Sequence, residues 1–144
     1  MKFADIQNLW EEDCSIDRTR LGDEALKIPK LHSKYYKIFT QEVMRLRKME
    51  AELKELRLEK WEFLTLGPTQ EALDKGWRLP PQGKILKNEV ELYLDTDKDI
   101  VDKTLKVGVQ KEKAKFLEAI LKELNGRNFH IRAAIDWERF RAGN

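Results

Sequence analysis

The chain has 144 residues, a formal net charge of +2 and 38% charged residues. This length suits one domain, and a charged fraction above the usual ~25% favours a helical protein with a thin core. Cys14 is the only cysteine, which excludes a disulfide framework. No apolar run reaches the roughly 18 residues of a membrane span, and the amino terminus does not resemble a secretory signal. We therefore expect a reducing, aqueous compartment and no membrane.

The amino-terminal segment predicts a short helix. Ile6, Leu9 and Trp10 recur at helical spacing within residues 4–12, so the segment is amphipathic and suits a docking role. Pro29 lacks a backbone donor and disfavours helical geometry at the residue before it. We therefore expect the chain to break there and a long helix to begin at Ser33, a plausible N-cap.

Residues 33–66 contain neither glycine nor proline and predict that long helix. Their apolar side chains recur at alternating spacings of three and four, which keeps one stripe turned toward a partner. The stripe comprises Tyr35, Phe39, Leu46, Met49, Leu53, Leu56 and Phe63, with Glu42 and Lys60 as its polar members. Such a helix spans about 50 Å, more than one compact core of this size requires. We therefore expect part of its face to contact another subunit.

Charge is distributed unevenly along the chain. Residues 1–24 carry three basic and seven acidic side chains, whereas residues 27–48 carry seven basic side chains and one acid. Tyr35, Tyr36 and Phe39 lie among these cations, a pattern that suits phosphates and stacked bases of a single strand. The alternative is an ordinary solvated helix face.

Gly67 and Pro68 end the long helix and open a loop that we extend over residues 67–88. Trp77 in this loop either stacks on a base or anchors the loop to the helix. Beyond it, Val90, Leu92 and Leu94 alternate with other side chains, a pattern that predicts a short strand or an irregular edge.

The last third of the chain predicts further helices. Thr96 with Asp99 indicates a helix start, and the pattern continues through Lys122 with a soft interruption at Gly108. Asn125 and Gly126 are expected to close this helix, and a final helix covers residues 128–141. One apolar stripe of the final helix comprises Phe129, Ala133, Trp137 and Phe140, and we expect it to be buried either in its own subunit or, as an oligomerisation surface, in a neighbour.

The sequence offers no catalytic or metal motif. It lacks both glycine-rich phosphate-binding patterns, and His32 and His130 stand far apart outside any ligand cluster. The acidic run 95–99 begins like a calcium loop, but Ile100 replaces the required glycine and Lys106 the required glutamate. We expect neither an enzyme nor a cofactor.

The remaining candidate site lies near the end of the long helix. Lys60 occupies a stripe position, Lys54 and Arg57 lie within two turns of it, and Trp61 is adjacent. A lysine on a packing stripe is costly to bury, so it either reaches solvent or faces a shared polar cavity. We interpret the three cations as a DNA-binding site, and the alternative is an ordinary amphipathic helix end.

Several segments together resemble the UvsY family, the recombination mediators of tailed bacteriophages. The resemblance extends over nearly the whole chain except about residues 66–88, and the segments that carry it are Ile16–Leu21, Ser33–Tyr35, Met49–Ala51, Asp97–Ile100, Phe129–Arg132 and Phe140–Asn144. The family's DNA-contact motif aligns with Leu58–Phe63, so that Lys60 carries over directly. The first basic position of that motif falls on Leu58, with Arg57 one residue earlier as its substitute.

The resemblance implies a non-enzymatic, ring-shaped homo-oligomer in the cytoplasm of the infected host cell. It implies binding to single-stranded DNA, to a phage recombinase and to the single-strand-binding protein that the recombinase replaces. It also associates oligomerisation with the carboxyl-terminal region.

We accordingly predict a mainly α protein of one domain, residues 1–144. Its parts are an amino-terminal segment (1–31), a long arm-like helix (32–66), a loop (67–88) and a carboxyl-terminal oligomerisation region (89–144). The alternative function is a coiled-coil adaptor that binds no DNA.

Overall fold

The computed structural model describes residues 1–143 and is built from helices. They are α1 (Phe3–Asp13), α2 (Leu21–Leu66), α3 (Gln70–Asp74), α4 (Val90–Thr96) and α5 (Lys98–Arg141). The residues group into two compact units: unit 1 combines residues 1–44 with the segment from 111 onward, and unit 2 covers residues 45–110. α2 and α5 each contribute residues to both units. The mainly α class with a long helix and carboxyl-terminal helices is confirmed.

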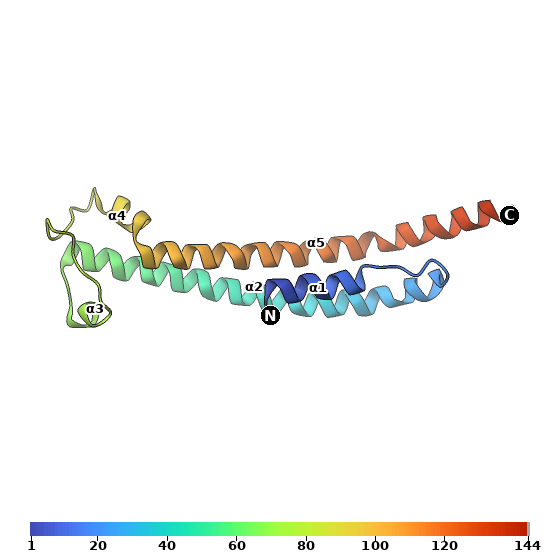
Figure 1. Cartoon of the computed structure of the whole chain (residues 1–144), viewed down its shortest axis with the longest axis horizontal. Coiled ribbons are helices and arrows are strands. Elements are labelled where there is room, and N and C mark those ends of the chain that lie inside the picture. Colours follow the sequence, from blue (N-terminus) through green and yellow to red (C-terminus); the bar gives the residue numbers. More distant parts are fainter. Residues whose placement is uncertain (144) are drawn as a thin grey trace. The chain divides into compact units, whose positions relative to one another are not determined.

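Unit 1 packs α1 against the first half of α2 and the second half of α5. Figure 1 shows α1 alongside the first part of α2. Its buried core comprises Ile6, Tyr35, Leu117, Ile120, Leu121 and Leu124. Trp10 meets the Tyr35 ring edge-on at 5.4 Å, so the helix predicted over residues 4–12 is an integral part of this core.

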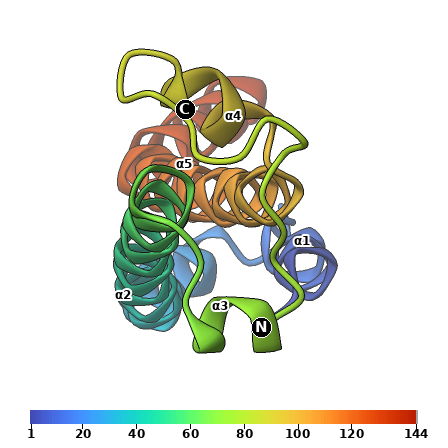
Figure 2. The same ribbon diagram turned by 90° about the vertical axis from the view of Figure 1, so that its left-hand side faces the viewer.

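Unit 2 combines the second half of α2 with α3, α4 and the start of α5. Here α3 and α4 lie on opposite sides of the α2–α5 pair (Figure 1, Figure 2). The buried core comprises Phe63, Leu64, Ala72, Ile85, Val90, Leu94 and Ile100. The loop predicted over 67–88 therefore contains α3, whose N-cap Thr69 accepts a hydrogen bond from the Ala72 amide.

The predicted helix break at Pro29 is wrong, because α2 begins at Leu21 and runs through this proline. A proline inside a helix costs about 3 kcal/mol. The flanking turns bury Ile28 and Tyr35 in unit 1, and this burial offsets the cost. Ser33 is consequently an interior residue and not an N-cap.

The predicted division of the carboxyl-terminal region into separate helices is also wrong. α5 is continuous through Gly108 and through Asn125-Gly126. Each glycine costs about 1 kcal/mol in a helix interior. Leu124, Arg127 and Ile131 are buried on both sides of Gly126, and the Arg127 guanidinium donates a hydrogen bond to the Cys14 carbonyl at 3.0 Å. Tertiary contacts thus keep the helix intact.

The short strand predicted over residues 90–94 is a helix, α4. A strand would place Val90, Leu92 and Leu94 on one face. Instead Val90 and Leu94, four residues apart, are buried together, whereas Leu92 is exposed. The apolar positions 90 and 94 therefore fit one turn of a helix as well as they fit an alternating strand. The described residues contain no strand. The predicted one-domain division of the chain stays a prediction.

Candidate nucleic-acid interface

Both polar members of the α2 stripe are buried and paired with charges on α5. In unit 1, Glu42 lies 3.5 Å from the Lys113 ammonium. In unit 2, Lys60 is only 6% exposed, and its ammonium lies 3.2 Å from Asp97 Oδ1 and 2.9 Å from Asp99 Oδ2. The long stripe is therefore a packing surface whose charged exceptions are neutralised within the protomer.

Lys60 also fixes the corner where α4 meets α5. Its ammonium lies 4.0 Å from the centroid of the Trp77 ring, and Trp77 packs edge-on against Phe63. Asp97 accepts a hydrogen bond from the Ile100 amide at 3.1 Å, so it caps the start of α5 while it pairs with Lys60. Trp77 has two predicted roles, and the structure supports the one in which it anchors the loop to the long helix.

The pKa of Asp99 reports this contact. The hydrogen bond that Lys60 donates holds the pKa of Asp99 below its ordinary value of 3.8, although burial opposes the shift. Because the folded pKa is below the unfolded value, the ionised carboxylate stabilises the protein above pH 3.8, and that contribution is lost as the pH falls through the folded pKa.

We therefore expect Asp99→Asn to lower the thermal midpoint at neutral pH and to lose this effect in acid. Circular dichroism melts of both proteins across this pH range measure the difference. Asp102→Asn on the same helix is the matched control, because Asp102 is exposed and has no ion pair among the described residues. A difference between wild type and Asp99→Asn that does not change with pH contradicts the assignment.

The other two predicted cations share a groove of about 390 Å³ in unit 2, which we call the Trp61 groove. Its lining comprises Lys54, Arg57, Leu58, Trp61, Glu91 and Leu94. Arg57 forms ion pairs with Glu91 and with Asp95, whereas Lys54 is exposed and has no ion pair among the described residues. The structure thus brings Lys54 and Arg57 together with an aromatic ring and separates Lys60 from them.

Lys87 is a cation of this region that sequence reasoning missed. Its ammonium lies 5.9 Å from the centroid of the Trp61 ring. It comes from the segment between α3 and α4, far along the chain from Trp61. No local sequence pattern indicates that Lys87 and Trp61 are neighbours, because they meet only when the loop folds. Cations beside a half-exposed indole suit a single strand, whose phosphates need charge and whose bases stack.

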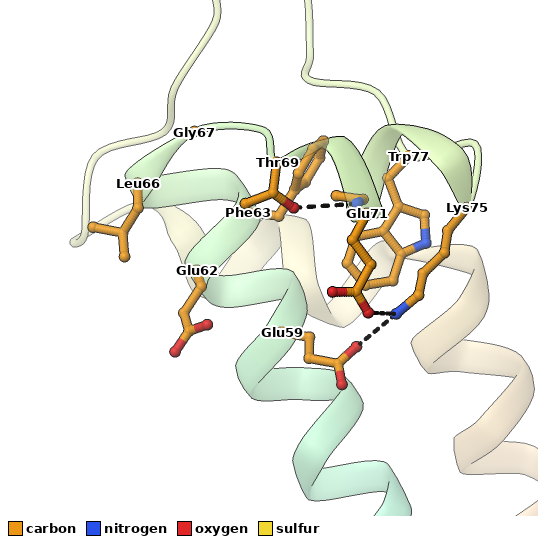
Figure 3. Close-up of a pocket in the computed structure, with 10 residues that line it drawn as sticks. Glu59, Glu62, Phe63, Leu66, Gly67, Thr69, Glu71, Lys75 and Trp77 are labelled. Carbon is orange, nitrogen blue, oxygen red and sulfur yellow. Dashed lines mark hydrogen bonds and ion pairs between the residues drawn. The ribbon is translucent and has the colours of Figure 1, made fainter.

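A second pocket of unit 2 has the opposite electrostatic character. This cavity, of about 280 Å³, carries the carboxylates of Glu59, Glu62 and Glu71. Figure 3 shows Lys75 reaching toward Glu59 and Glu71, at 3.4 Å and 3.5 Å. The hydrogen bond to Glu59 raises the pKa of Lys75, yet one ammonium does not balance three carboxylates. This pocket therefore repels phosphate.

The basic segment 27–48 divides between the two units. Tyr35, which the sequence offered as a stacking residue, is buried in unit 1, and its hydroxyl donates a hydrogen bond to Asp13 at 2.7 Å. The stacking interpretation of Tyr35 is therefore wrong. Tyr36 is 52% exposed and stacks on His32 with ring centroids 6.0 Å apart.

The predicted oligomerisation stripe lies on the surface of unit 1. Phe129 and Phe140 are each 72% exposed, Trp137 is 53% exposed and Ala133 is exposed. Trp137 and Phe140 stack on each other with centroids 5.6 Å apart. Aromatic rings gathered on one exposed helix face mark an interaction surface.

Within residues 1–143, no group of histidine, cysteine or carboxylate side chains could hold a metal ion. The helices of this part of the chain are all too short or too polar to cross a bilayer.

The comparisons with known proteins decide the family. The family model described as "Recombination, repair and ssDNA binding protein UvsY" matches residues 9–144. The chain belongs to the UvsY family. The resemblance seen in the sequence is thereby confirmed, although Asn144, the last residue of its carboxyl-terminal segment, lies outside the described residues.

Crystal structures of the recombination mediator protein UvsY of bacteriophage T4 have the same fold. One in lattice type II has a TM-score of 0.79 and 23% identity, and the match covers 99% of this chain and 98% of that chain. Another in lattice type IV has a TM-score of 0.77 and 20% identity, covering 98% of this chain and 99% of that chain. Among curated proteins, none matches significantly. Membership of the UvsY family makes this a phage recombination protein that binds single-stranded DNA, whereas the DNA contacts of individual residues stay predictions.

Proposed function

We propose that the protein is a non-enzymatic recombination mediator that loads a phage recombinase onto single strands covered by single-strand-binding protein. It acts in the cytoplasm of the infected host cell. The observation that carries the proposal is the family match over residues 9–144, whose description names recombination, repair and single-stranded DNA binding. The T4 protein with the same fold is itself described as a recombination mediator.

The Trp61 groove is the proposed DNA contact within each protomer. Lys54 can contact a phosphate without giving up a carboxylate partner, because it is exposed and has no ion pair among the described residues. Arg57 is more than one-third exposed, so a phosphate can replace Glu91 or Asp95 as its partner. Lys60 has two carboxylates and an indole around it, so a direct contact requires the strand to displace them. We propose that Lys60 mainly holds the corner of unit 2 that carries Glu91 and Asp95.

Self-association is proposed to multiply this contact. The exposed stripe of Phe129, Ala133, Trp137 and Phe140 supports a homo-oligomer, and a ring is the closed form of such an interface. Identical weak sites on one assembly raise avidity without new chemistry. The adaptor alternative is less well supported, because most of the apolar stripe of α2 that a coiled-coil partner needs already packs within unit 1 or unit 2.

Binding of fluorescent oligo-dT, followed by anisotropy, tests the proposal. We expect affinity to fall with salt with a logarithmic slope of about 0.7 per neutralised phosphate. Lys54→Ala combined with Arg57→Ala is expected to weaken binding and to reduce that slope. On strands coated with single-strand-binding protein, the wild type is expected to accelerate assembly of the recombinase.

Lys106→Ala provides the matched control, since Lys106 is an exposed cation of unit 2 that does not line the Trp61 groove. An affinity that ignores salt, or equal losses in the control and the double variant, overturns the DNA-contact assignment. Failure to accelerate recombinase assembly overturns the mediator role.

A further inference from the structure

A second groove, in unit 1, combines features that the Trp61 groove lacks. It has a volume of about 330 Å³ and lies between α2 and α5, so we call it the α2–α5 groove. Its lining comprises Ile28, Pro29 and His32 from α2 and Leu124, Asn125 and Asn128 from α5. Of these described lining residues, none carries a carboxylate. The acids that compete with phosphate at Arg57 are thus missing from this lining.

The floor and the rim of the groove differ in polarity. Ile28 is 8% exposed and Leu124 is fully buried, so the floor is apolar. The rim carries the Asn125 and Asn128 amides and the His32 imidazole. Within residues 1–143, these three side chains form no hydrogen bond with another protein group. They are therefore available to a ligand with both donors and acceptors at its edge.

An aromatic surface continues from the rim along α2. The His32 and Tyr36 rings are nearly parallel, with 11° between their planes. Tyr36 in turn lies 6.4 Å from Phe39. A flat ligand binds most favourably when it leaves water for an apolar floor and also stacks on such rings.

One cation flanks the groove on α5, and others lie on the far face of α2. Lys30 and Lys37 are seven residues apart and share the face of α2 that is turned away from His32, so they add positive charge to the helix but do not line the groove. Arg132 follows Asn128 by one helical turn on α5. These three side chains are exposed and have no ion pair among the described residues. The α2 sequence between residues 25 and 41 contains no acid, so the local potential favours a polyanion.

We propose that the α2–α5 groove holds a nucleobase of single-stranded DNA, with the base on the Ile28–Leu124 floor, its edge at the Asn125 and Asn128 amides, and an adjoining phosphate at Arg132. The proposal rests on the proposed DNA-binding function and adds a second contact to it. A phosphate alone would not leave water for an apolar floor. A base within a duplex is stacked on its neighbours, so its face is not free to contact the groove. Side-chain amides both donate and accept, so the groove suits any base.

The test compares two probes, fluorescent oligo-dT and a strand of equal length with abasic sites in place of its bases. The variants are Asn125→Ala with Asn128→Ala, and separately His32→Ala, in the full chain. We expect each to weaken oligo-dT binding about tenfold, as is typical for loss of one base contact. Binding of the abasic strand and the salt slope should stay unchanged, because no phosphate contact is removed.

Asn8→Ala is the matched control, because Asn8 is an exposed asparagine of unit 1 outside the groove. Alanine raises helix propensity at all three asparagine positions, and circular dichroism melts verify that every variant stays folded. Unchanged oligo-dT affinity in the groove variants, or equal losses on both probes, overturns the groove. A wild-type protein that binds oligo-dT no better than the abasic strand also overturns it. A wild type that binds neither probe at low salt refutes the DNA-binding function itself.

Discussion

Replacing both Trp137 and Phe140 with serine is expected to convert the assembled protein into single protomers. Large aromatic side chains at the centre of an interface each contribute about 2 kcal/mol or more, so two losses weaken each contact by about a thousandfold. Both rings are more than half exposed in the protomer, so their removal should leave its fold intact. Sedimentation velocity at micromolar concentration measures the change in mass.

Leu26→Ser is the control for this experiment, since Leu26 is 80% exposed in the same unit but lies outside the carboxyl-terminal stripe. It should leave the mass unchanged. The double variant should also bind oligo-dT more weakly, because avidity depends on the number of sites held together. A double variant that is folded and retains the wild-type mass contradicts the proposed interface.

Reversing the charge of Lys60 is expected to destabilise the protein strongly. Lys60→Glu places a third carboxylate beside Asp97 and Asp99 in a buried position. Removing one partner of a buried ion pair typically costs about 3–5 kcal/mol, and the partial exposure of both aspartates favours the lower end. Urea denaturation followed by circular dichroism measures the free energy of unfolding.

Two further variants separate a structural role from a DNA contact. Lys54→Glu reverses an exposed charge on the same helix and should change stability by no more than about 0.5 kcal/mol. Combining Lys60→Glu with Asp99→Lys restores an opposite-charge pair and should recover part of the loss. If Lys60→Glu instead keeps full stability and loses DNA affinity, Lys60 is a direct contact and our structural assignment is wrong.

The packing stripe of α2 could be predicted because it depends on spacing alone. Tyr35 and Phe63 are buried as their periodicity indicates. The helix boundaries were predicted less well, since Pro29 and Gly126 act locally while the burial that outweighs them comes from distant residues. Val90 shows the same limit, because two buried positions four residues apart fit a short alternating pattern as well as a helix.

The candidate site illustrates why charge is harder to predict than packing. Lys60 stands out in the sequence as a cation on an apolar stripe, but its partners, Asp97 and Asp99, come from the start of another helix. Nothing near Lys60 in the chain signals that pairing. The α2–α5 groove was missed for the same reason, since His32 and Asn125 meet only after the two long helices have packed.

Unit 1 is built from two separate segments of the chain, and this affects the order in which the protein folds. Unit 2 is one uninterrupted stretch, residues 45–110, whereas unit 1 requires α1 to meet the second half of α5. During synthesis, unit 2 therefore has all its parts before unit 1 does, and the contacts that close unit 1 span most of the chain. Until the second half of α5 leaves the ribosome, α1 and early α2 cover each other only in part, so a nascent chain that stalls before residue 111 leaves a core that includes Ile6 and Tyr35 incompletely covered and open to chaperones and proteases.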